Sequence, residues 1–249
     1  MIYSDSHVHF TKINTIECLS LDMHINCVTN TVQDYRLASK LYGSMKNITV
    51  SAGYHPLYYT QSCEELDDYL SIISKERFIG EIGLDIKATH NMNYQKEVLR
   101  EIIRTANLSG AQVINLHNRK TLRESMDIIS EFKGITIFHR FSGNVQDYNN
   151  ISNNPNWYVS INPMLITNYD WREIKKIPIK QILLESDAPF TLKESNIYDI
   201  TYIISLYNLM AKNLAIKVEN LVDIIASNYL SVYRVSDSKN FSLLSRNWM

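Results

Sequence analysis

Short runs of apolar and β-branched residues recur along the chain, and longer stretches with helical spacing separate them. The eight runs are IYSDSHVHF from Ile2, HINCVTN from His24, ITVSAGYHP from Ile48, FIGEIGLD from Phe78, QVINLHN from Gln112, ITIFHRF from Ile135, WYVSIN from Trp157 and ILLESDAP from Ile182. Periodicity alone does not separate runs this short from buried helix, but their length, β-branching and spacing favour strands. We therefore predict eight strands, with the weakest patterns at the second and the seventh.

The stretches between the runs predict helices, because their apolar residues repeat at positions i, i+3 and i+4. In the stretch 95–108 these positions are Val98, Leu99, Ile102, Ile103 and Ala106. In the next stretch they are Leu122, Met126, Ile129 and Phe132. Two further helices are expected after the eighth run, at about Ile197–Lys212 and Val218–Tyr229.

Strands that alternate with helices over short connections predict an α/β protein with a parallel sheet. Eight such units in 249 residues fit a closed (β/α)8 TIM barrel better than an open, doubly wound sheet. No linker rich in glycine, serine or proline divides the chain. We therefore expect a single hydrolase domain over residues 1–235, with residues 236–249 as a short tail.

Composition and charge narrow the class of protein further. Hydrophobic residues make up 45% of the chain and charged residues 20%, which is typical of a globular protein, and the net charge is −1. Such a chain lacks the overall positive charge that holds nucleic acid by its backbone alone. Three cysteines without a CxxC pair favour a reducing compartment, so we expect a cytoplasmic protein. No apolar stretch reaches the length of a membrane span, and no membrane partner is expected.

Histidine is concentrated at the ends of the predicted strands. The chain has seven histidines, and only His24 and His90 lie elsewhere. The other five are His7, His9, His55, His117 and His139. In a barrel of this kind the chemistry lies at the carboxyl ends of the strands, so these five imidazoles converge on one rim.

Carboxylates follow the same rule: Glu81 and Asp85 lie in the fourth predicted strand, and Glu185 and Asp187 follow the eighth. Each residue has a separate structural explanation, since a lone histidine is often structural, Glu81 could pair with a cation and Asp187 could cap a turn. Nitrogen and oxygen donors gathered at one rim are more simply explained by divalent metal ions. The candidate ligands are His7, His9, Glu81, His117, His139 and Asp187.

The donor types suggest how such a centre would work. Imidazoles with carboxylates suit zinc, manganese or iron, whereas magnesium prefers oxygen donors, so the choice among Mg²⁺, Mn²⁺ and Zn²⁺ stays open. Glu81 is placed to bridge two cations, because a carboxylate has two oxygens. Asp187 is the candidate to bind one metal and to accept a proton from the attacking water. Asp5, on the same strand face as His7, is a candidate to orient an imidazole.

The motifs HVH, GYHP, EIGLD, LHNR, FHRFSG and ESDAP occur in this order at suitable intervals. Together they resemble the TatD family of metal-dependent deoxyribonucleases, in the amidohydrolase-like superfamily, from about Ile2 to about Val235. The resemblance implies a phosphodiesterase with two divalent metal ions that trims single-stranded DNA from the 3′ end. Magnesium commonly supports this activity in the family.

The resemblance also implies roles for individual residues. One metal would be held by His7, His9, Glu81 and Asp187, and the other by Glu81, His117 and His139. His55, Arg119 and Glu185 match positions near the scissile phosphate, and Asp187, Glu81 and His55 are the expected catalytic residues. A guanidinium can grip phosphate with two hydrogen bonds, although Arg119 could equally be a solvated arginine at a helix start.

Three departures from the family pattern fall on loops that would shape the substrate cleft. Phe10 and Thr11 replace the acidic residue that often follows HxH, Arg140 stands where a small or neutral residue is usual, and residues 190–200 lack the family's proline-containing stretch. These departures put the substrate preference in doubt. One alternative is a specialised role as a TatD-like component of a multi-protein anti-phage defence system.

Two other classes of function are open from the sequence. Similar barrels hydrolyse small molecules such as lactones, amides or phosphoesters, and a barrel can also serve as a non-catalytic subunit that binds protein partners. For DNA as partner, Tyr54, Tyr58 and Tyr59 flank His55 and could stack on bases, although the chain has 16 tyrosines and their presence there could be chance. With a net charge of −1 we expect binding to single-stranded ends rather than tight duplex binding.

Overall fold

Eight parallel strands form one sheet in the computed structural model, which describes residues 1–13, 15–16, 23–60, 63–141, 143–192 and 197–233. In spatial order they are β1 (Tyr3–Val8), β3 (Met23–Val28), β4 (Ile48–Tyr54), β5 (Phe78–Asp85), β6 (Val113–Arg119), β7 (Ile135–Phe138), β8 (Trp157–Ile161) and β9 (Ile182–Leu184). The amide of Asp187 donates to the His7 carbonyl at 2.9 Å, and the amide of His9 donates to the Ala188 carbonyl at 2.8 Å. These bonds join the first strand to the end of the last, so the predicted (β/α)8 barrel is confirmed.

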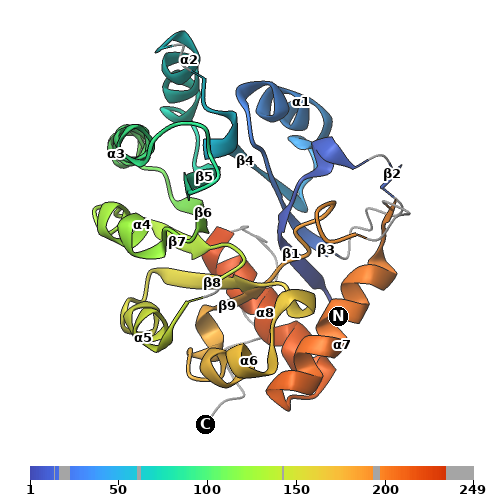
Figure 1. Cartoon of the computed structure of the whole chain (residues 1–249). Helices are drawn as coiled ribbons and strands as arrows, with labels where there is room; N and C mark the ends of the chain where they lie inside the picture. Colours follow the sequence, from blue (N-terminus) through green and yellow to red (C-terminus); the bar gives the residue numbers. More distant parts are fainter. Residues whose placement is uncertain (14, 17–22, 61–62, 142, 193–196, 234–249) are drawn as a thin grey trace.

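Helices surround this barrel (Figure 1). They are α1 (Val32–Tyr42), α2 (Cys63–Ile73), α3 (Met92–Ser109), α4 (Leu122–Ile129), α5 (Val145–Asn153), α6 (Asn168–Ile174), α7 (Ile200–Leu214) and α8 (Val218–Tyr233). The predicted helix at 95–108 lies within α3, which begins after the cap Asn91 and ends at Gly110. All five of its predicted core residues are buried, and each valine, leucine or isoleucine side chain among them contributes roughly 1.5–3 kcal/mol when fully buried.

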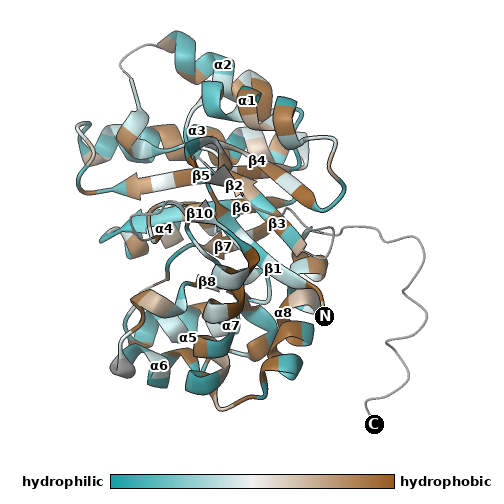
Figure 2. Ribbon diagram, turned by 90° about the vertical axis from the view of Figure 1, so that its right-hand side faces the viewer, coloured by the Kyte–Doolittle hydropathy of each residue, from teal (hydrophilic) through white to brown (hydrophobic). Residues whose placement is uncertain are grey.

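The last helix closes one end of the barrel. Tyr229 and Tyr233 of α8 pack in one buried cluster with Val113, Ile137 and Leu183, which lie in the barrel strands. Figure 2 shows the barrel from the side, with hydrophobic and hydrophilic residues alternating along the helices, as amphipathic packing requires. With α8 across the amino-terminal end, the open end of the barrel is the one at the carboxyl ends of the strands.

The start of α7 differs from the prediction. Ile197–Tyr198 forms a short strand, β10, which pairs in parallel with β2 (Thr15–Ile16) in a separate sheet. The side chain of Asp199 accepts a hydrogen bond from the amide of Tyr202 and caps the helix, which therefore begins at Ile200. The expected tail, residues 236–249, lies outside the described residues. Within the described part of the chain, no helix combines the length and the apolar character needed to cross a membrane.

Candidate metal centre

The carboxylate of Glu81 lies at the centre of the open end of the barrel and faces two groups of donors with its two oxygens. Oε2 lies 3.5 Å from Nε2 of His7 and 3.4 Å from Nε2 of His9. Those two nitrogens are 3.3 Å apart, and Nε2 of His9 is 3.7 Å from Oδ1 of Asp187. The structure therefore brings together all four residues expected to share one metal ion.

The other oxygen of Glu81 faces the residues of the later strands. Oε1 lies 2.7 Å from Nδ1 of His117, 3.5 Å from Nε2 of His139 and 3.4 Å from Nε2 of His55. The second expected ligand set thus surrounds the second oxygen, with His55 beside it. Each oxygen of the Glu81 carboxylate thus has its own group of neighbouring donors.

The donors fit divalent cations by their chemistry. Nε2 of His7 and Nε2 of His9 converge on the same carboxylate oxygen, and all three side chains are at most 4% exposed. Buried imidazole lone pairs and carboxylate oxygens aimed at one point are the donor set that zinc, manganese and iron prefer. The same reasoning holds for the donors at Oε1.

A glycine allows β5 and β6 to deliver two of these side chains side by side. Gly83 pairs with His117 in the register of the two strands and has a φ of +148°. A Cβ at this position would lie 1.9 Å from the His117 carbonyl oxygen. Only glycine adopts this backbone conformation without strain and permits so close an approach.

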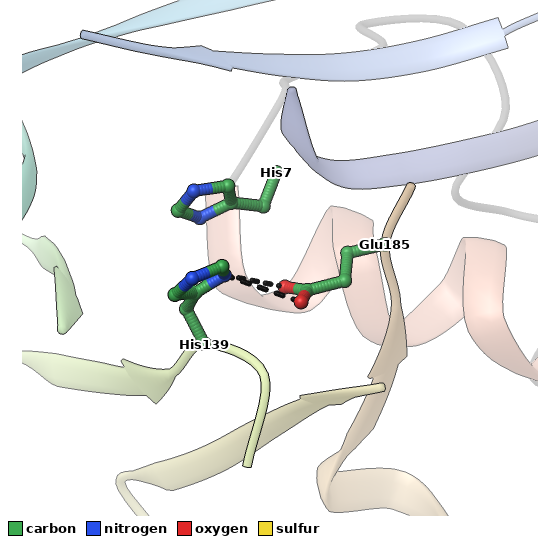
Figure 3. Close-up of side chains that lie close together, drawn as sticks. All are labelled: His7, His139 and Glu185. Carbon is green, nitrogen blue, oxygen red and sulfur yellow. Dashed lines mark hydrogen bonds and ion pairs between the residues drawn. The ribbon is translucent and has the colours of Figure 1, made fainter. Parts of the chain in front are cut away.

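Two of the imidazoles are held from behind by further carboxylates. Nε2 of His117 donates to Oδ2 of Asp85 at 2.9 Å, while its Nδ1 faces Glu81. Nδ1 of His139 donates to Glu185 at 3.2 Å (Figure 3). Its Nε2 faces Glu81. A carboxylate behind a histidine fixes its tautomer and leaves the opposite nitrogen free to bind a metal.

Glu185 lies beside His139, and its expected place near the scissile phosphate stays a prediction. Its side chain is fully buried, and its carboxylate also accepts hydrogen bonds from the amide of Arg140 and the hydroxyl of Ser160. The ligand atoms of Glu185, His7 and His139 lie within 4.8 Å of one another, so this carboxylate lies next to the candidate ligands. Figure 3 also shows the His7 ring stacked on that imidazole, with ring centroids 3.8 Å apart.

Asp5 differs from its expected role. Its Oδ1 accepts hydrogen bonds from the amides of His7 and Ser186, and its Oδ2 accepts one from the hydroxyl of Tyr198. The side chain therefore binds the backbone and a tyrosine rather than an imidazole. It fixes the end of β1 against the segment that leads to Asp187.

His55 is distinguished from the other imidazoles by its hydrogen bonds. Its Nδ1 accepts from the amide of Leu57 at 3.1 Å, so the neutral ring carries its proton on Nε2. Burial lowers the pKa of His55 to about 4 against the opposing charge of Glu81, which keeps the ring neutral near pH 7. Nε2 is thus a donor that points toward the centre.

Two arginines lie at the edge of the centre, and each side chain is 40% exposed. Nε of Arg119 is 3.6 Å from Oδ2 of Asp85, and Nη1 of Arg140 donates to Oδ2 of Asp187 at 3.0 Å. Both guanidinium groups keep exposed N–H donors that could reach a phosphate.

Interactions with the surrounding histidines lower the pKa of the Glu81 carboxylate, which faces the centre. Burial alone would raise that pKa, but the interactions with His55, His139 and His117 outweigh burial and hold it well below its usual range. Burial raises the pKa of Glu185, which lies behind the centre. Carboxylates facing the centre are thus ionised, as metal ligands must be.

Comparison with known proteins decides the family. The family model described as TatD related DNase matches residues 4–234. The chain belongs to this family. It is a TatD-family metal-dependent hydrolase, as the six motifs predict.

Individual relatives of this TatD-family protein are distant. An uncharacterized metal-dependent hydrolase of Buchnera aphidicola is 25% identical over 211 residues, which cover 76% of this chain and 79% of that protein. A TATDN1 homologue of Vairimorpha ceranae, provisionally named a deoxyribonuclease, is 29% identical over 56% of this chain and 51% of that protein. The structure of YJJV, a TatD homologue of Escherichia coli, has a TM-score of 0.77 at 15% identity and covers 92% of this chain and 97% of that one. This last likeness concerns the fold alone.

Sequence reasoning missed some residues that the structure places at the centre. The sequence places Asp85 with Glu81 among the carboxylates of the rim but does not predict its role, which is to orient His117. Ser160 donates to Glu185 from the interior face of β8, where nothing in the sequence marks it. The contact between Arg140 and Asp187 joins residues 47 positions apart, and no local pattern indicates it.

Proposed function

We propose that this TatD-family hydrolase is a deoxyribonuclease that uses two divalent metal ions to remove nucleotides from the 3′ end of single-stranded DNA. The observation that carries the proposal is the division of donors around Glu81, with one group on each oxygen. Deoxyribonuclease is also the activity in the family's description and in the name of the relative from Vairimorpha ceranae.

Six residues would hold the metal ions in this proposal. His7, His9 and Asp187 would hold one cation and His117 and His139 the other, with Glu81 between them. Cations bound there would act as Lewis acids that polarise the phosphate and lower the pKa of water. Magnesium, manganese and zinc are the candidate ions.

The chain's own groups would then move the protons and hold the phosphate. Oδ1 of Asp187 faces His9 and would accept the proton of the attacking water. Nε2–H of His55 would donate to a phosphate oxygen, because its Nδ1 is occupied by the amide of Leu57. Arg119 and Arg140 would bind the non-bridging oxygens of the same phosphate.

The decisive experiment incubates the purified protein with single-stranded DNA labelled at the 5′ end, in Mg²⁺ or Mn²⁺. Stepwise shortening of the labelled strand is the expected result. A strand labelled at the 3′ end must lose its label in the first step, which distinguishes attack at the 3′ end from attack elsewhere. Asp187→Asn serves as the inactive control.

A second assay tests the small-molecule alternative with a lactone and a p-nitrophenyl ester. Turnover of either compound together with intact DNA would overturn the proposal.

Two thiols, Cys27 and Cys63, are free and agree with the reducing cytoplasm that we expect for this protein.

A further inference from the structure

Three side chains beside the metal centre share one relationship to it: each follows a residue of the centre by three positions. Lys12 follows His9 at the end of the 3₁₀ turn Phe10–Lys12, and its amide donates to the His9 carbonyl at 2.9 Å. In the same way, the amide of Tyr58 donates to the His55 carbonyl at 2.9 Å, and that of Phe190 to the Asp187 carbonyl at 3.0 Å. The backbone of the centre thus fixes the place of all three.

The three side chains meet although they come from different loops. Nζ of Lys12 lies 3.0 Å from the hydroxyl of Tyr58, 4.5 Å from the centroid of its ring and 5.9 Å from the centroid of the Phe190 ring. The Phe190 ring contacts the His9 ring edge to face, and the two ring centroids are 5.1 Å apart. The cluster therefore lies directly against the imidazole proposed to hold the first cation.

Lys12 keeps a hydrogen-bond donor available. An ammonium has three N–H donors. One reaches the Tyr58 hydroxyl, and a second reaches the side-chain oxygen of Asn30 at 2.7 Å when that amide is oriented to satisfy both of its polar atoms. No carboxylate of the described residues forms an ion pair with this lysine. A positive charge held by neutral groups, with one donor left, is suited to an anionic ligand.

The aromatic side of the cluster is open to solvent. Phe190 is 56% exposed and Tyr58 is 42% exposed, whereas Tyr54 and Tyr59, the other tyrosines beside His55, are buried. Of the three tyrosines in that segment, only Tyr58 could therefore meet a ligand. A large apolar ring exposed next to a cation provides the two surfaces that a nucleotide needs, one for its base and one for its phosphate.

We propose that Lys12 and Phe190 form a nucleotide subsite, which rests on the proposed deoxyribonuclease function. Lys12 binds the phosphate next to the scissile one, Phe190 stacks on a base of the same strand, and Tyr58 is a positioning residue that holds the ammonium. Lys12 directly follows Phe10 and Thr11, and Phe190 begins the segment 190–200, so both lie at departures from the family pattern.

The test for Lys12 measures binding rather than turnover. The metal-loaded protein is titrated with a single-stranded phosphorothioate oligonucleotide, which resists cleavage, at several salt concentrations. Lys12→Gln should weaken binding about tenfold and reduce the slope of log affinity against log salt by about 0.7, the value for one phosphate contact on a single strand. Lys12→Arg should restore both. Lys133→Gln, which removes a lysine beside the cavity at the opposite end of the barrel, is the matched control and should bind like wild type.

The test for Phe190 pairs the protein change with a change in the DNA. Phe190→Leu should weaken binding about 5- to 150-fold, the range for loss of one stacked base. One abasic nucleotide is then moved through the last four positions of the strand. At the position that meets Phe190, the abasic strand should bind wild type and variant equally. Tyr58→Phe should weaken binding less than Lys12→Gln and add nothing to it in the double variant.

The outcomes separate the two proposals. If wild type shortens and binds DNA while Lys12→Gln and Phe190→Leu bind it unchanged, the subsite is wrong and the proposed function stands. If wild type neither binds nor shortens DNA, the deoxyribonuclease function is wrong and the subsite is wrong with it.

Discussion

The two oxygens of the Asp187 carboxylate have different partners, because the guanidinium of Arg140 binds only one of them. Nη1 of Arg140 donates to Oδ2 at 3.0 Å, while Oδ1 faces Nε2 of His9 at 3.7 Å. Both residues have left-handed backbones, with φ of 45° at Arg140 and 52° at Asp187. Such conformations cost of order 1–3 kcal/mol each and persist only where the surrounding structure imposes them.

Arg140→Ala should change metal binding and catalysis in opposite directions. A fixed positive charge beside a metal ligand repels an incoming cation but attracts a phosphate. We expect manganese to bind about 3- to 10-fold more tightly, by titration calorimetry, and kcat/KM on DNA to fall about 10- to 100-fold through the loss of a charged hydrogen bond. For Arg140→Lys, manganese affinity and kcat/KM should each lie between the values of wild type and Arg140→Ala. A parallel loss of metal affinity and rate would show that Arg140 only positions Asp187.

Glu81→Gln and Asp187→Asn should each lower the rate of DNA hydrolysis by at least ~100-fold, because each change removes a charged ligand or a proton acceptor. Glu81→Gln should also reduce the number of metal ions per chain, measured by elemental analysis. Glu101→Gln is the matched control, since Glu101 pairs with Arg104 on the exposed surface of α3. Near-normal rates in Glu81→Gln would contradict a bridging role.

Glu185→Gln tests whether this buried carboxylate acts through His139. The change keeps the size of the side chain but weakens its hold on Nδ1 of His139. Loss of such an orienting partner typically costs 10- to 100-fold in metal affinity or activity, and we expect a loss in that range. Ser160→Ala, which removes a neutral donor to the same carboxylate, should cost less. If Glu185→Gln raised KM alone and left metal affinity intact, direct contact with the substrate would be the better account.

Much of the barrel and its candidate ligands can be predicted because both follow from local pattern and topology. A short β-branched run predicts a strand, and eight parallel strands bring their carboxyl ends to one rim. His117 and Glu81 lie far apart in sequence, yet their positions on neighbouring parallel strands suffice to place them together.

Side-chain direction and long-range pairing are what the sequence leaves open. Glu185 and Asp187 are two residues apart, yet one carboxylate lies behind His139 and the other faces His9. The turn of the chain after β9 sets this difference, and no periodicity describes it. Ile197–Tyr198 has an apolar pattern that also suits a helix, and it forms a strand because Thr15–Ile16 lies alongside it.

Removal of metal should lower thermal stability. A ligand that binds only the folded state at 100 times its Kd stabilises it by about 2.7 kcal/mol. For a chain of this size, that corresponds to a fall in Tm of about 5–10 °C when a chelator removes the metal. Scanning calorimetry with and without chelator measures the shift. Glu81→Gln should show a smaller shift, and an equal shift in this variant would place the stabilising metal outside the centre.

Gly83→Ala should disrupt the junction of β5 and β6 that supports the centre. The added Cβ would meet the His117 carbonyl oxygen at 1.9 Å, and the φ of +148° is strained for alanine. We expect a loss of at least about 3 kcal/mol in the free energy of unfolding, measured by urea denaturation, together with weaker metal binding as His117 moves. Gly110→Ala is the matched control, because its φ of +72° is also positive but its Cβ would have no atom within 4 Å. It should cost only about 1 kcal/mol and leave metal affinity unchanged. Equal losses in the two variants would mean that backbone conformation alone, and not the close approach to His117, explains the glycine.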